Sequence, residues 1–398
     1  MSVRSTHTET DEDLYRLAEL NTRTMNHVTA QAVGEPVHVQ TVRHSAFPYQ
    51  WGSVSTAGLW KVVVSYATPS QRNGDHAFFV KLLRNPRLWP QLNLLPEAIR
   101  REFLDYLPWK FEYEVHESGI AEALPPGMRM PILYHAEHTG DDWLALWWEC
   151  VDLDPEPWRA DDFARTAYLL GRLAAKRRPG AAVNARLPAI CHQRRFGGAL
   201  RYFVTTRVQQ AELPILRERS TWQTPLLAQA LAVVDDPELP EDLARLADRL
   251  PAILDQLDRL PHTFAHGDAS PQNLLIPRTD RDERVVIDWG FGTLLPIGFD
   301  LGQLLVGLVH AGEMAPTELE NIQSVIVPAY VEGLAEDRYW CAERDVRQGF
   351  LGSLVARSAL TSIPTELLDQ PVTDDNQELL VDRLLLTRYL VELAKDLG

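Results

Sequence analysis

The sequence lacks long apolar runs and cysteine pairs, and each absence excludes a class of protein. No hydrophobic stretch approaches the roughly 18 residues that a membrane-spanning helix needs. The first residues, MSVRSTHTETDEDLYRL, are polar and acidic, unlike a secretory signal peptide. Three cysteines occur, Cys150, Cys191 and Cys341, far apart and without a CxxC motif. This usage is typical of a reducing compartment, so we predict a cytoplasmic protein without a membrane partner.

Basic charge is also in short supply, since 39 lysines and arginines stand against 55 aspartates and glutamates, a formal net charge of -16. Nucleic-acid binding normally requires a basic face, so nucleic acid is not expected as a partner. The charge leaves room for an acidic cleft that attracts a cationic ligand. The composition, 45% hydrophobic and 24% charged, is that of a soluble globular protein. A chain of 398 residues is too long for one ordinary core and suits two lobes.

The pattern of apolar residues changes from strand-rich to helical near residue 150. The elements expected before that point are a helix over 11–33, antiparallel strands over 58–69 and 76–84, a helix in two pieces over 96–127 and a buried strand over 143–154. After it we expect a helix from Asp161 to just before Pro179, more helices to Leu260 and a last one over 377–397. The prediction is an α+β protein whose first lobe, 1–150, has a helix and an antiparallel sheet and whose second, 151–398, is mostly helical.

Two short motifs in the second lobe place metal-binding and acid–base side chains close together. They are HGDASPQN, residues 266–273, and VVIDWG, residues 285–290. Phosphoryl transfer needs a group that orients the acceptor hydroxyl and oxygen ligands for Mg²⁺, which prefers carboxylate, amide oxygen and water. The pattern H-x-D-x-x-x-x-N supplies both. We predict that Asp268 orients the hydroxyl and accepts its proton, and that Asn273 and Asp288 bind Mg²⁺.

These motifs resemble the catalytic loop and metal motif of the kinase-like superfamily, and within it those of the aminoglycoside phosphotransferase and choline kinase-like family. Gly267 stands where protein kinases usually have an arginine that reads a phosphorylated activation loop. Eleven residues separate Asp288 from Asp300, too few for a regulated activation segment. The stretch GFDLGQLL, from Gly298, is similar to the helix start that follows the metal motif in this family. The motifs that carry the resemblance cover about residues 265–305.

The resemblance implies a bilobal protein-kinase-like fold, with a nucleotide-binding N-terminal lobe and a C-terminal lobe that holds the catalytic loop, metal site and acceptor pocket. It also implies supporting residues around the loop. In this family His266 braces the loop by hydrogen bonds rather than transferring a proton. Asp300, at an expected helix start, is suited to cap the helix or hold the loop as well as to touch a ligand, and we favour the structural role.

Lys81 is the candidate that binds the α- and β-phosphates of the nucleotide. It lies in the middle of FFVKLL, an apolar strand pattern, where an ammonium group is costly unless it meets an anion. The alternative is an edge-strand lysine that points to water. The family pairs this lysine with a glutamate on a helix, and similarity to its WRRE-like helix indicates Glu112 in WKFEYEVHES, with Glu114 as the alternative.

The remaining nucleotide-binding candidates come from a loop and from the last strand of the first lobe. The loop WGSVSTAGLWKV lacks GxGxxG, which departs from protein kinases but suits the antibiotic kinase branch. Its candidates for contact with the phosphates, through backbone and hydroxyl groups, are Gly52, Ser53, Ser55, Thr56 and Gly58. In WWECV the resemblance implies that the backbone from Glu149 to Val151 binds the base, so side-chain identity says little there.

Two charged clusters that can recognise the acceptor point in opposite directions. The acidic cluster consists of Asp152, Asp154, Glu156, Asp161 and Asp162. It suits an aminocyclitol or another cation, or it is a solvated linker followed by a helix cap. The basic cluster in HQRRFGGALRYF consists of Arg194, Arg195 and Arg201. With aromatic residues nearby, it suits an anionic or nucleoside-like acceptor equally well, and the sequence does not decide between them.

The sequence therefore predicts a small-molecule O-phosphotransferase. It moves the γ-phosphate of ATP or GTP, with Mg²⁺, to a hydroxyl of an antibiotic or related natural product of the aminoglycoside or nucleoside type. Transfer is expected to be direct and in line, because no nucleophile is evident that could carry a phospho-enzyme.

Two alternatives stay open. The first is a metabolic kinase on the same fold, acting on choline, a sugar or an amino alcohol. A choline site needs an aromatic cage, and the sequence alone does not assemble one from Trp147, Trp148, Trp158 and Trp222. The second is a nucleotide-binding pseudokinase without chemistry. A pseudokinase usually lacks at least one of the residues needed for transfer, whereas this sequence has all four: Lys81, Asp268, Asn273 and Asp288.

Overall fold

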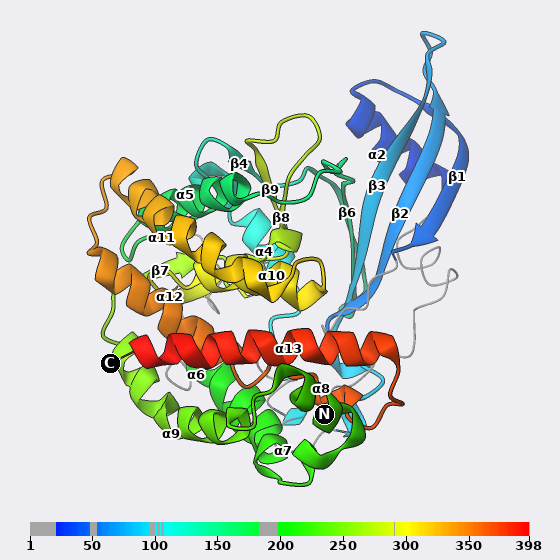
Figure 1. The fold of residues 1–398 in the computed structure, drawn as a ribbon. Helices are drawn as coiled ribbons and strands as arrows, with labels where there is room; N and C mark the ends of the chain where they lie inside the picture. Colours follow the sequence, from blue (N-terminus) through cyan, green and yellow to red (C-terminus); the bar gives the residue numbers. More distant parts are fainter. Residues whose placement is uncertain are drawn as a thin grey trace. The chain divides into compact units, whose positions relative to one another are not determined.

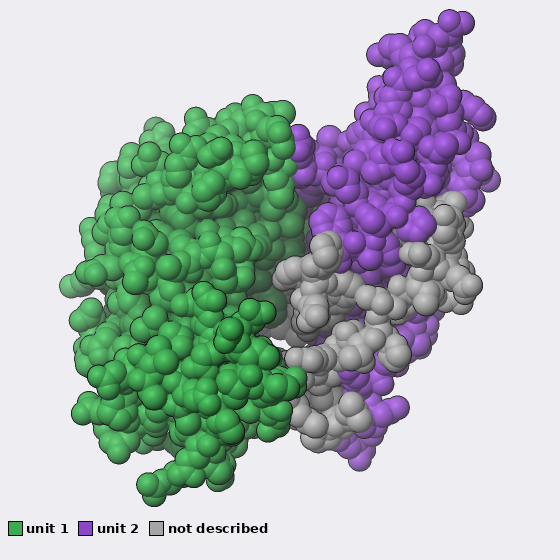
Figure 2. All heavy atoms as spheres, turned by 45° about the vertical axis from the view of Figure 1, so that its right-hand side comes forward, with its two compact units in different colours: residues 1–2, 115–129, 153–398 green, residues 3–114, 130–152 purple. Residues whose placement is uncertain are grey.

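The structure, a computed structural model, describes residues 21–47, 54–94, 107–182, 198–289 and 291–397, together with Glu97, Arg100, Arg101 and Leu104. The chain divides into two compact units (Figure 2). The first, which we call the sheet unit, comprises residues 3–114 and 130–152. The second, the helical unit, comprises residues 1–2, 115–129 and 153–398. The segment 115–129 therefore groups with the C-terminal part of the chain.

Five antiparallel strands in the order β1-β2-β3-β6-β5 form the sheet unit (Figure 1). The strands are β1 (His38–Ala46), β2 (Thr56–Ala67), β3 (Asn73–Arg84), β5 (Leu133–Thr139) and β6 (Trp143–Glu149). β2 and β3 pair with Leu59 opposite Lys81. The strands expected over 58–69 and 76–84 are thus confirmed as antiparallel neighbours. The buried strand expected over 143–154 is confirmed over 143–149 as β6, whereas residues 150–154 lie beyond its end.

One face of this sheet packs on helix α2 (Thr22–Val33). Met25 and Val28 of the helix are buried with Trp60 and Phe78 of the strands. Side chains alternate between the two faces of a strand, so every second residue of β2 and β3 enters this core. The helix expected over 11–33 is confirmed from residue 22 on, and residues 11–20 lie outside the described residues.

Helices make up most of the helical unit. They are α5 (Ala160–Lys176), α6 (Ala199–Phe203), α7 (Leu213–Arg217), α8 (Pro225–Val234), α9 (Leu239–Leu257), α10 (Asp300–Ala311), α11 (Leu319–Glu336), α12 (Glu343–Ser358) and α13 (Asp374–Leu393). A π-helix, Val204–Glu212, joins α6 to α7. Helix α4 (Phe111–Glu117) begins in the sheet unit and ends in the helical unit, because the division between the units falls after Glu114. The helices predicted from Asp161 and at the C-terminus are confirmed as α5 and α13. None of the helices in the described ranges is long and apolar enough to cross a membrane.

Helices α5 and α11 approach each other closely through two glycines. A Cβ atom at Gly171 would lie 2.1 Å from the carbonyl oxygen of Tyr330, and one at Gly333 would lie 2.0 Å from that of Tyr168. Each glycine therefore lets the backbone of the other helix come into contact, and a larger residue would force the pair apart.

Two small sheets in the helical unit carry the sequence motifs. β7 (His262–Ala265) pairs with β10 (Thr293–Pro296). β8 (Leu274–Leu275) pairs with β9 (Arg284–Val286), which also pairs with β4 (Met128–Arg129). HGDASPQN therefore connects β7 to β8, and the acidic residue of VVIDWG comes just after β9.

Candidate active site

The hairpin of β8 and β9 brings the ends of the two motifs together. Leu274 is the partner of Val286 in the ladder, and the nitrogen of Ile287 donates to the carbonyl oxygen of Asn273 at 3.0 Å. Asn273 and Asp288 therefore lie at the same end of this hairpin. The geometry brings together the two residues that the sequence marks as metal ligands.

Asp268 fixes the orientation of the Asn273 side chain. Its Nδ2 donates to the carbonyl oxygen of Asp268 at 2.9 Å and to Asp268 Oδ2 at 3.2 Å. Both partners are acceptors only, so the nitrogen must face them and the amide oxygen must face away. That oxygen is the atom that can bind a cation.

Asp288 has an unusual backbone conformation, with φ of +55° in the left-handed region. The left-handed region is uncommon for residues other than glycine, although Asp and Asn enter it more readily than most, and in this chain Gln71, Asp235 and Arg338 also adopt it. It turns the chain sharply where β9 has ended, immediately before Trp289, which is fully buried. The turn falls on the carboxylate that follows the strand, as expected of a ligand that must point in a fixed direction.

The donor set fits Mg²⁺ rather than a soft metal. One carboxylate and one amide oxygen are hard ligands, and Mg²⁺ typically takes one or two protein carboxylates and fills its other positions with water and phosphate. Within the ranges that the structure describes, no three His, Cys, Asp or Glu side chains gather into a metal site. One carboxylate and one amide oxygen would leave coordination positions that water and phosphate oxygens could fill.

His266 links the two motifs. Its Nε2 lies 2.9 Å from the carbonyl oxygen of Ile287, and its Nδ1 accepts from the nitrogen of Asp268 at 3.2 Å. With Nδ1 accepting, the ring proton must be on Nε2, which donates to Ile287. The ring is buried against Trp289, with centroids 4.6 Å apart. Both ring nitrogens are thus used to hold the loop.

Asp300 holds the same loop from the start of α10. Its Oδ2 accepts from the nitrogen of His266 at 2.9 Å and its Oδ1 from the nitrogen of Gly267 at 2.8 Å. The side chain is buried, and burial raises the pKa of this carboxyl above its usual value, while the His266 ring, the two N–H groups and Arg177 oppose the rise. Both carboxylate oxygens are taken up by the backbone of the loop.

Arg357, on α12, contacts the catalytic loop and was missed in the sequence. Its Nη2 lies 2.9 Å from Asp268 Oδ1, and its Nη1 donates to the carbonyl oxygen of Gly267 at 2.5 Å. It lies 89 residues beyond Asp268 in VARSAL, an ordinary helical stretch. No local pattern could have indicated it, because only the packing of α12 brings it to the loop.

Gly267 is required by the packing of the loop. Its φ is +84°, and a Cβ atom there would lie 2.1 Å from the carbonyl oxygen of Phe291. No other residue fits without moving the segment that follows the metal motif. The glycine that distinguishes this loop from that of protein kinases thus has a steric cause in this chain.

In the sheet unit, Lys81 forms an ion pair with Glu112. Lys81 Nζ lies 2.6 Å from Glu112 Oε2, and both side chains are nearly buried. Glu114, the alternative partner, is exposed. Lys81 lies in β3, a strand with neighbours on both sides, so the reading of an edge-strand lysine that points to water is wrong.

The loop before β2 is described only at its end. Ser53, like Gly52, lies outside the described residues, whereas Ser55 is half-buried and Thr56 is buried. Arg84 fixes this end of the loop, since its nitrogen donates to the carbonyl oxygen of Ser55 at 2.8 Å. The contact of Ser53, Ser55 and Thr56 with phosphates stays a prediction.

The backbone at the end of β6 is partly committed to the sheet. The nitrogen of Glu149 donates to the carbonyl oxygen of Ile132 at 2.8 Å, and the nitrogen of Ile132 lies 3.2 Å from Glu149 Oε2. The N–H of Glu149 is therefore used within the sheet and is not available to a base. Val151, two residues on, is half-buried. Base binding by Glu149 and Val151 stays a prediction.

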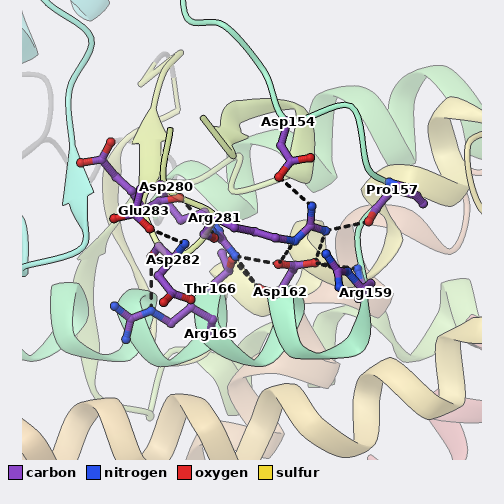
Figure 3. A network of polar contacts seen from close by, with 11 residues as sticks. Asp154, Pro157, Arg159, Asp162, Arg165, Thr166, Asp280, Arg281, Asp282 and Glu283 are labelled. Atoms are coloured by element: carbon purple, nitrogen blue, oxygen red, sulfur yellow. Dashed lines mark hydrogen bonds and ion pairs between the residues drawn. The ribbon is translucent and has the colours of Figure 1, made fainter. Parts of the chain in front are cut away.

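Two of the five residues of the acidic cluster, Asp154 and Asp162, form internal ion pairs in the helical unit (Figure 3). Arg281 Nη1 lies 2.9 Å from Asp154 Oδ2, and its Nη2 lies 2.6 Å from Asp162 Oδ2. Arg284, fully buried, donates to Thr166 Oγ1 at 2.6 Å and to the carbonyl oxygen of Asp162 at 3.0 Å. Burial lowers the pKa of Arg284 to about 10. The network ties the start of α5 to the β8–β9 hairpin, which is a structural role.

The basic cluster is described only in part. Arg194 and Arg195 lie outside the described residues. Arg201 is paired, with Nη2 at 2.6 Å from Asp255 Oδ1 and Nε at 2.8 Å from Asp258 Oδ2. Arg201 therefore joins α6 to the end of α9, and its positive charge is already paired with two carboxylates rather than available to an anionic acceptor.

Comparison with solved structures shows the fold. The chain is similar to a microcompartment-associated aminopropanol kinase, at 14% identity and a TM-score of 0.52, covering 90% of this chain and 94% of that one. It is also similar to an aminoglycoside phosphotransferase from Alicyclobacillus acidocaldarius, at 15% identity and a TM-score of 0.44, covering 84% and 90%. The likeness to the first confirms the predicted α+β, protein-kinase-like fold, and at this identity it shows the fold alone.

Comparison with protein families is more informative. A search of curated proteins found no match. The sequence model of the phosphotransferase enzyme family (APH) matches residues 114–323, which include both motifs. Because this match extends over more than half of the chain, the protein belongs to the phosphotransferase enzyme family, and the predicted enzyme class, a small-molecule phosphotransferase with an alcohol group as acceptor, is confirmed.

Proposed function

We propose that this enzyme transfers the γ-phosphate of ATP or GTP, in the presence of Mg²⁺, to a hydroxyl group of an antibiotic or related natural product. The observation that carries the proposal is the hydrogen bond between Ile287 and Asn273, which joins the two motifs at one end of a hairpin. Phosphoryl transfer depends on positioning and charge more than on covalent chemistry, and this arrangement supplies both.

In the proposal Asp268 accepts the proton of the acceptor hydroxyl. The acceptor oxygen forms a bond to the γ-phosphorus while the bond from that phosphorus to the β-phosphate oxygen breaks, and the nucleoside diphosphate leaves. Asn273 and Asp288 would hold Mg²⁺, which would supply positive charge that offsets the negative charge of the phosphates. His266 and Asp300 keep the loop in place.

The sheet unit supplies the residues proposed to hold the nucleotide. Lys81, kept in position by Glu112, neutralises charge on the α- and β-phosphates. A lysine that is nearly buried needs an anion, and the family's chemistry offers a second one in the phosphates. Ser53, Ser55 and Thr56 bind phosphate through their backbone or hydroxyl groups, and the backbone of Glu149 and Val151 binds the base.

The acceptor is proposed to be of the nucleoside type rather than a polycationic aminocyclitol. Asp154 and Asp162, two of the five acidic residues that suited a cation, are both paired with arginine. The charged side chain next to Asp268 is Arg357, and Phe291, 57% exposed, lies beside that guanidinium with the ring centroid 5.6 Å from Cζ. The exposed ring of Phe291 suits a flat, uncharged ring system near the reacting hydroxyl, and the positive charge of Arg357 disfavours ammonium groups there.

A metabolic kinase remains the second candidate, though a choline site receives little support. Trp147 and Trp148 are buried in the sheet unit, Trp158 packs on Phe163, and Trp222 donates to a backbone carbonyl oxygen. These four side chains are occupied and form no cage. Sugars and amino alcohols need no cage and belong in the test.

The experiment that tests the proposal measures release of ADP from ATP and of GDP from GTP, with and without Mg²⁺. The acceptors are aminoglycosides, nucleoside antibiotics, sugars, choline and amino alcohols. We expect strong Mg²⁺-dependent release with one acceptor class, and mass spectrometry should find the acceptor heavier by one phosphoryl group. Tight binding of Mg²⁺-nucleotide with no release across all acceptors would instead support the pseudokinase.

A further inference from the structure

Arg357 holds the catalytic loop by a two-pronged contact. One guanidinium nitrogen meets the carbonyl oxygen of Gly267 at 2.5 Å, and another meets Asp268 Oδ1 at 2.9 Å. The second carboxylate oxygen of Asp268 accepts from Asn273 at 3.2 Å. Both oxygens of Asp268 therefore have a fixed partner, and a carboxylate fixed at both oxygens has one orientation instead of several.

The guanidinium is itself fixed by aromatic rings. Its Cζ lies 5.7 Å from the ring centroid of Phe203, 5.6 Å from that of Phe291 and 5.8 Å from that of Phe299. The side chain is 15% exposed, compared with 28% for that of Asp268. Rings within 6 Å of the guanidinium restrict the rotamers of this long side chain, so little conformational freedom is lost when it holds its partner.

This environment differs from that of an ordinary surface ion pair. On the same helix, Arg347 pairs with Glu343 at 3.0 Å, and both side chains are about half exposed. Such a pair contributes little to stability or order. Arg357, by contrast, is shielded from water, holds two acceptors in one segment and meets the group on which transfer depends.

We propose that Arg357 is a positioning residue that sets the orientation of Asp268 for proton acceptance, an inference that rests on the proposed function. It acts through Asp268 and does not bind the nucleotide or the acceptor. Its planar fork is needed, because a lysine offers a single point charge that cannot reach both the Gly267 carbonyl and the Asp268 carboxylate in this geometry.

The first test compares Arg357→Ala with Arg347→Ala, a matched loss of arginine on the same helix. For Arg357→Ala we expect kcat to fall by roughly 10²-fold, with KM for nucleotide and acceptor changed by less than about threefold. Methylguanidine or ethylguanidine should restore part of the lost rate, and Arg357→Lys should recover only part of it. Arg347→Ala should behave as wild type. A loss that appears mainly in KM would overturn the proposal.

A double-mutant cycle then asks whether the effect passes through Asp268. If Arg357 only positions Asp268, adding Arg357→Ala to Asp268→Asn should lower the residual rate by less than about twofold. If the second substitution lowers it by roughly 10²-fold again, Arg357 acts on the substrates directly and the positioning role is refuted.

A structural measurement tests the positioning role even if no acceptor supports turnover, which would be a failure of the proposed function and not of this inference. Crystal structures of the wild type and of Arg357→Met are compared at Asp268. Methionine keeps an apolar side chain among the rings, so the variant should fold. We expect the Asp268 carboxylate to leave its wild-type place, and a carboxylate that stays within about 0.5 Å of it would overturn the proposal.

Discussion

The Oδ1 atom of Asp300 lies 2.8 Å from the backbone nitrogen of Gly267, 33 residues earlier in the chain. Its Oδ2 atom accepts from the next nitrogen back, that of His266. A single buried carboxylate thus satisfies two adjacent N–H groups of the catalytic loop, which would otherwise be left without acceptors in the interior. The position of Asp268, one residue on, follows from this anchor.

Asp300→Asn should therefore reduce both stability and activity. The amide offers one acceptor oxygen to two N–H groups, and its NH₂ group faces the other, which costs about 1–3 kcal/mol in free energy of unfolding. We expect kcat to fall by roughly 10²-fold as the loop shifts. Urea unfolding and steady-state rates measure the two effects. Asp345→Asn, in the first turn of α12, is the control and should change neither much; a wild-type kcat in Asp300→Asn would refute the role.

The pair of Lys81 and Glu112 can be tested against Glu114, its neighbour on the same helix. Glu112→Gln removes the negative charge that lies 2.6 Å from the nearly buried ammonium group, so we expect a loss of about 3 kcal/mol in free energy of unfolding. We also expect kcat/KM for the nucleotide to fall by about tenfold or more. Glu114→Gln, at an exposed position, should stay within about 0.5 kcal/mol of wild type. Equal effects of the two variants would contradict the assignment.

Gly267→Ala separates steric conflict from backbone strain when it is compared with Gly312→Ala. Both glycines have positive φ, +84° and +73°, but a Cβ atom at Gly312 meets nothing within 4 Å, whereas one at Gly267 meets the Phe291 oxygen. Gly312→Ala should cost about 1 kcal/mol. Gly267→Ala should cost distinctly more and abolish most activity. Thermal unfolding and kcat measure this, and similar losses in both variants would show that the close approach is unimportant.

His310 should make the folded state sensitive to acid. Burial, helped by Arg383 and Arg357, lowers the pKa of His310 to about 3. In the unfolded chain the ring binds a proton near pH 6.5, and in the fold it does not. As pH falls from about 6.5 towards 3, the unfolded state takes up a proton that the folded state excludes, and the free energy of unfolding drops by about 1.4 kcal/mol per pH unit.

Urea unfolding of wild type and His310→Gln at several pH values from about 7.5 to 4.5 measures this effect. The difference in free energy of unfolding between the two should shift in favour of the variant as pH falls. His38→Gln, which removes an exposed imidazole from β1, is the control. A pH-independent difference between wild type and His310→Gln would contradict the prediction.

The sequence predicted what depends on local spacing. Asp268 and Asn273 lie on one short loop, and the apolar run before Asp288 indicates a strand that delivers it to a sheet end. The apolar run FFVKLL likewise placed Lys81 inside a strand. Local spacing alone did not decide between Glu112 and Glu114, because residues two apart on a short helix face different sides and only the docking of that helix decides which one meets the lysine. The preference for Glu112 came from the resemblance to the family.

What the sequence could not supply depends on contacts between distant segments. Arg357 reaches Asp268 only because α12 packs beside the loop. The acidic cluster looked equally suited to a ligand or to solvent, and its actual partners, Arg281 and Arg284, come from a hairpin more than 100 residues away. A cluster of charged residues in the sequence therefore indicates a candidate binding site, but it does not show which of those residues already pair with opposite charges elsewhere in the fold.

The most direct test of the account compares wild type with Asp268→Asn on the best acceptor from the panel. We predict that kcat falls by about 10²–10⁴-fold, because asparagine cannot accept the proton of the hydroxyl. Binding of Mg²⁺-nucleotide, measured by calorimetry, should stay within about threefold of wild type, since Asn273 and Asp288 remain in place. Undiminished turnover in Asp268→Asn would contradict the account and move the active site elsewhere.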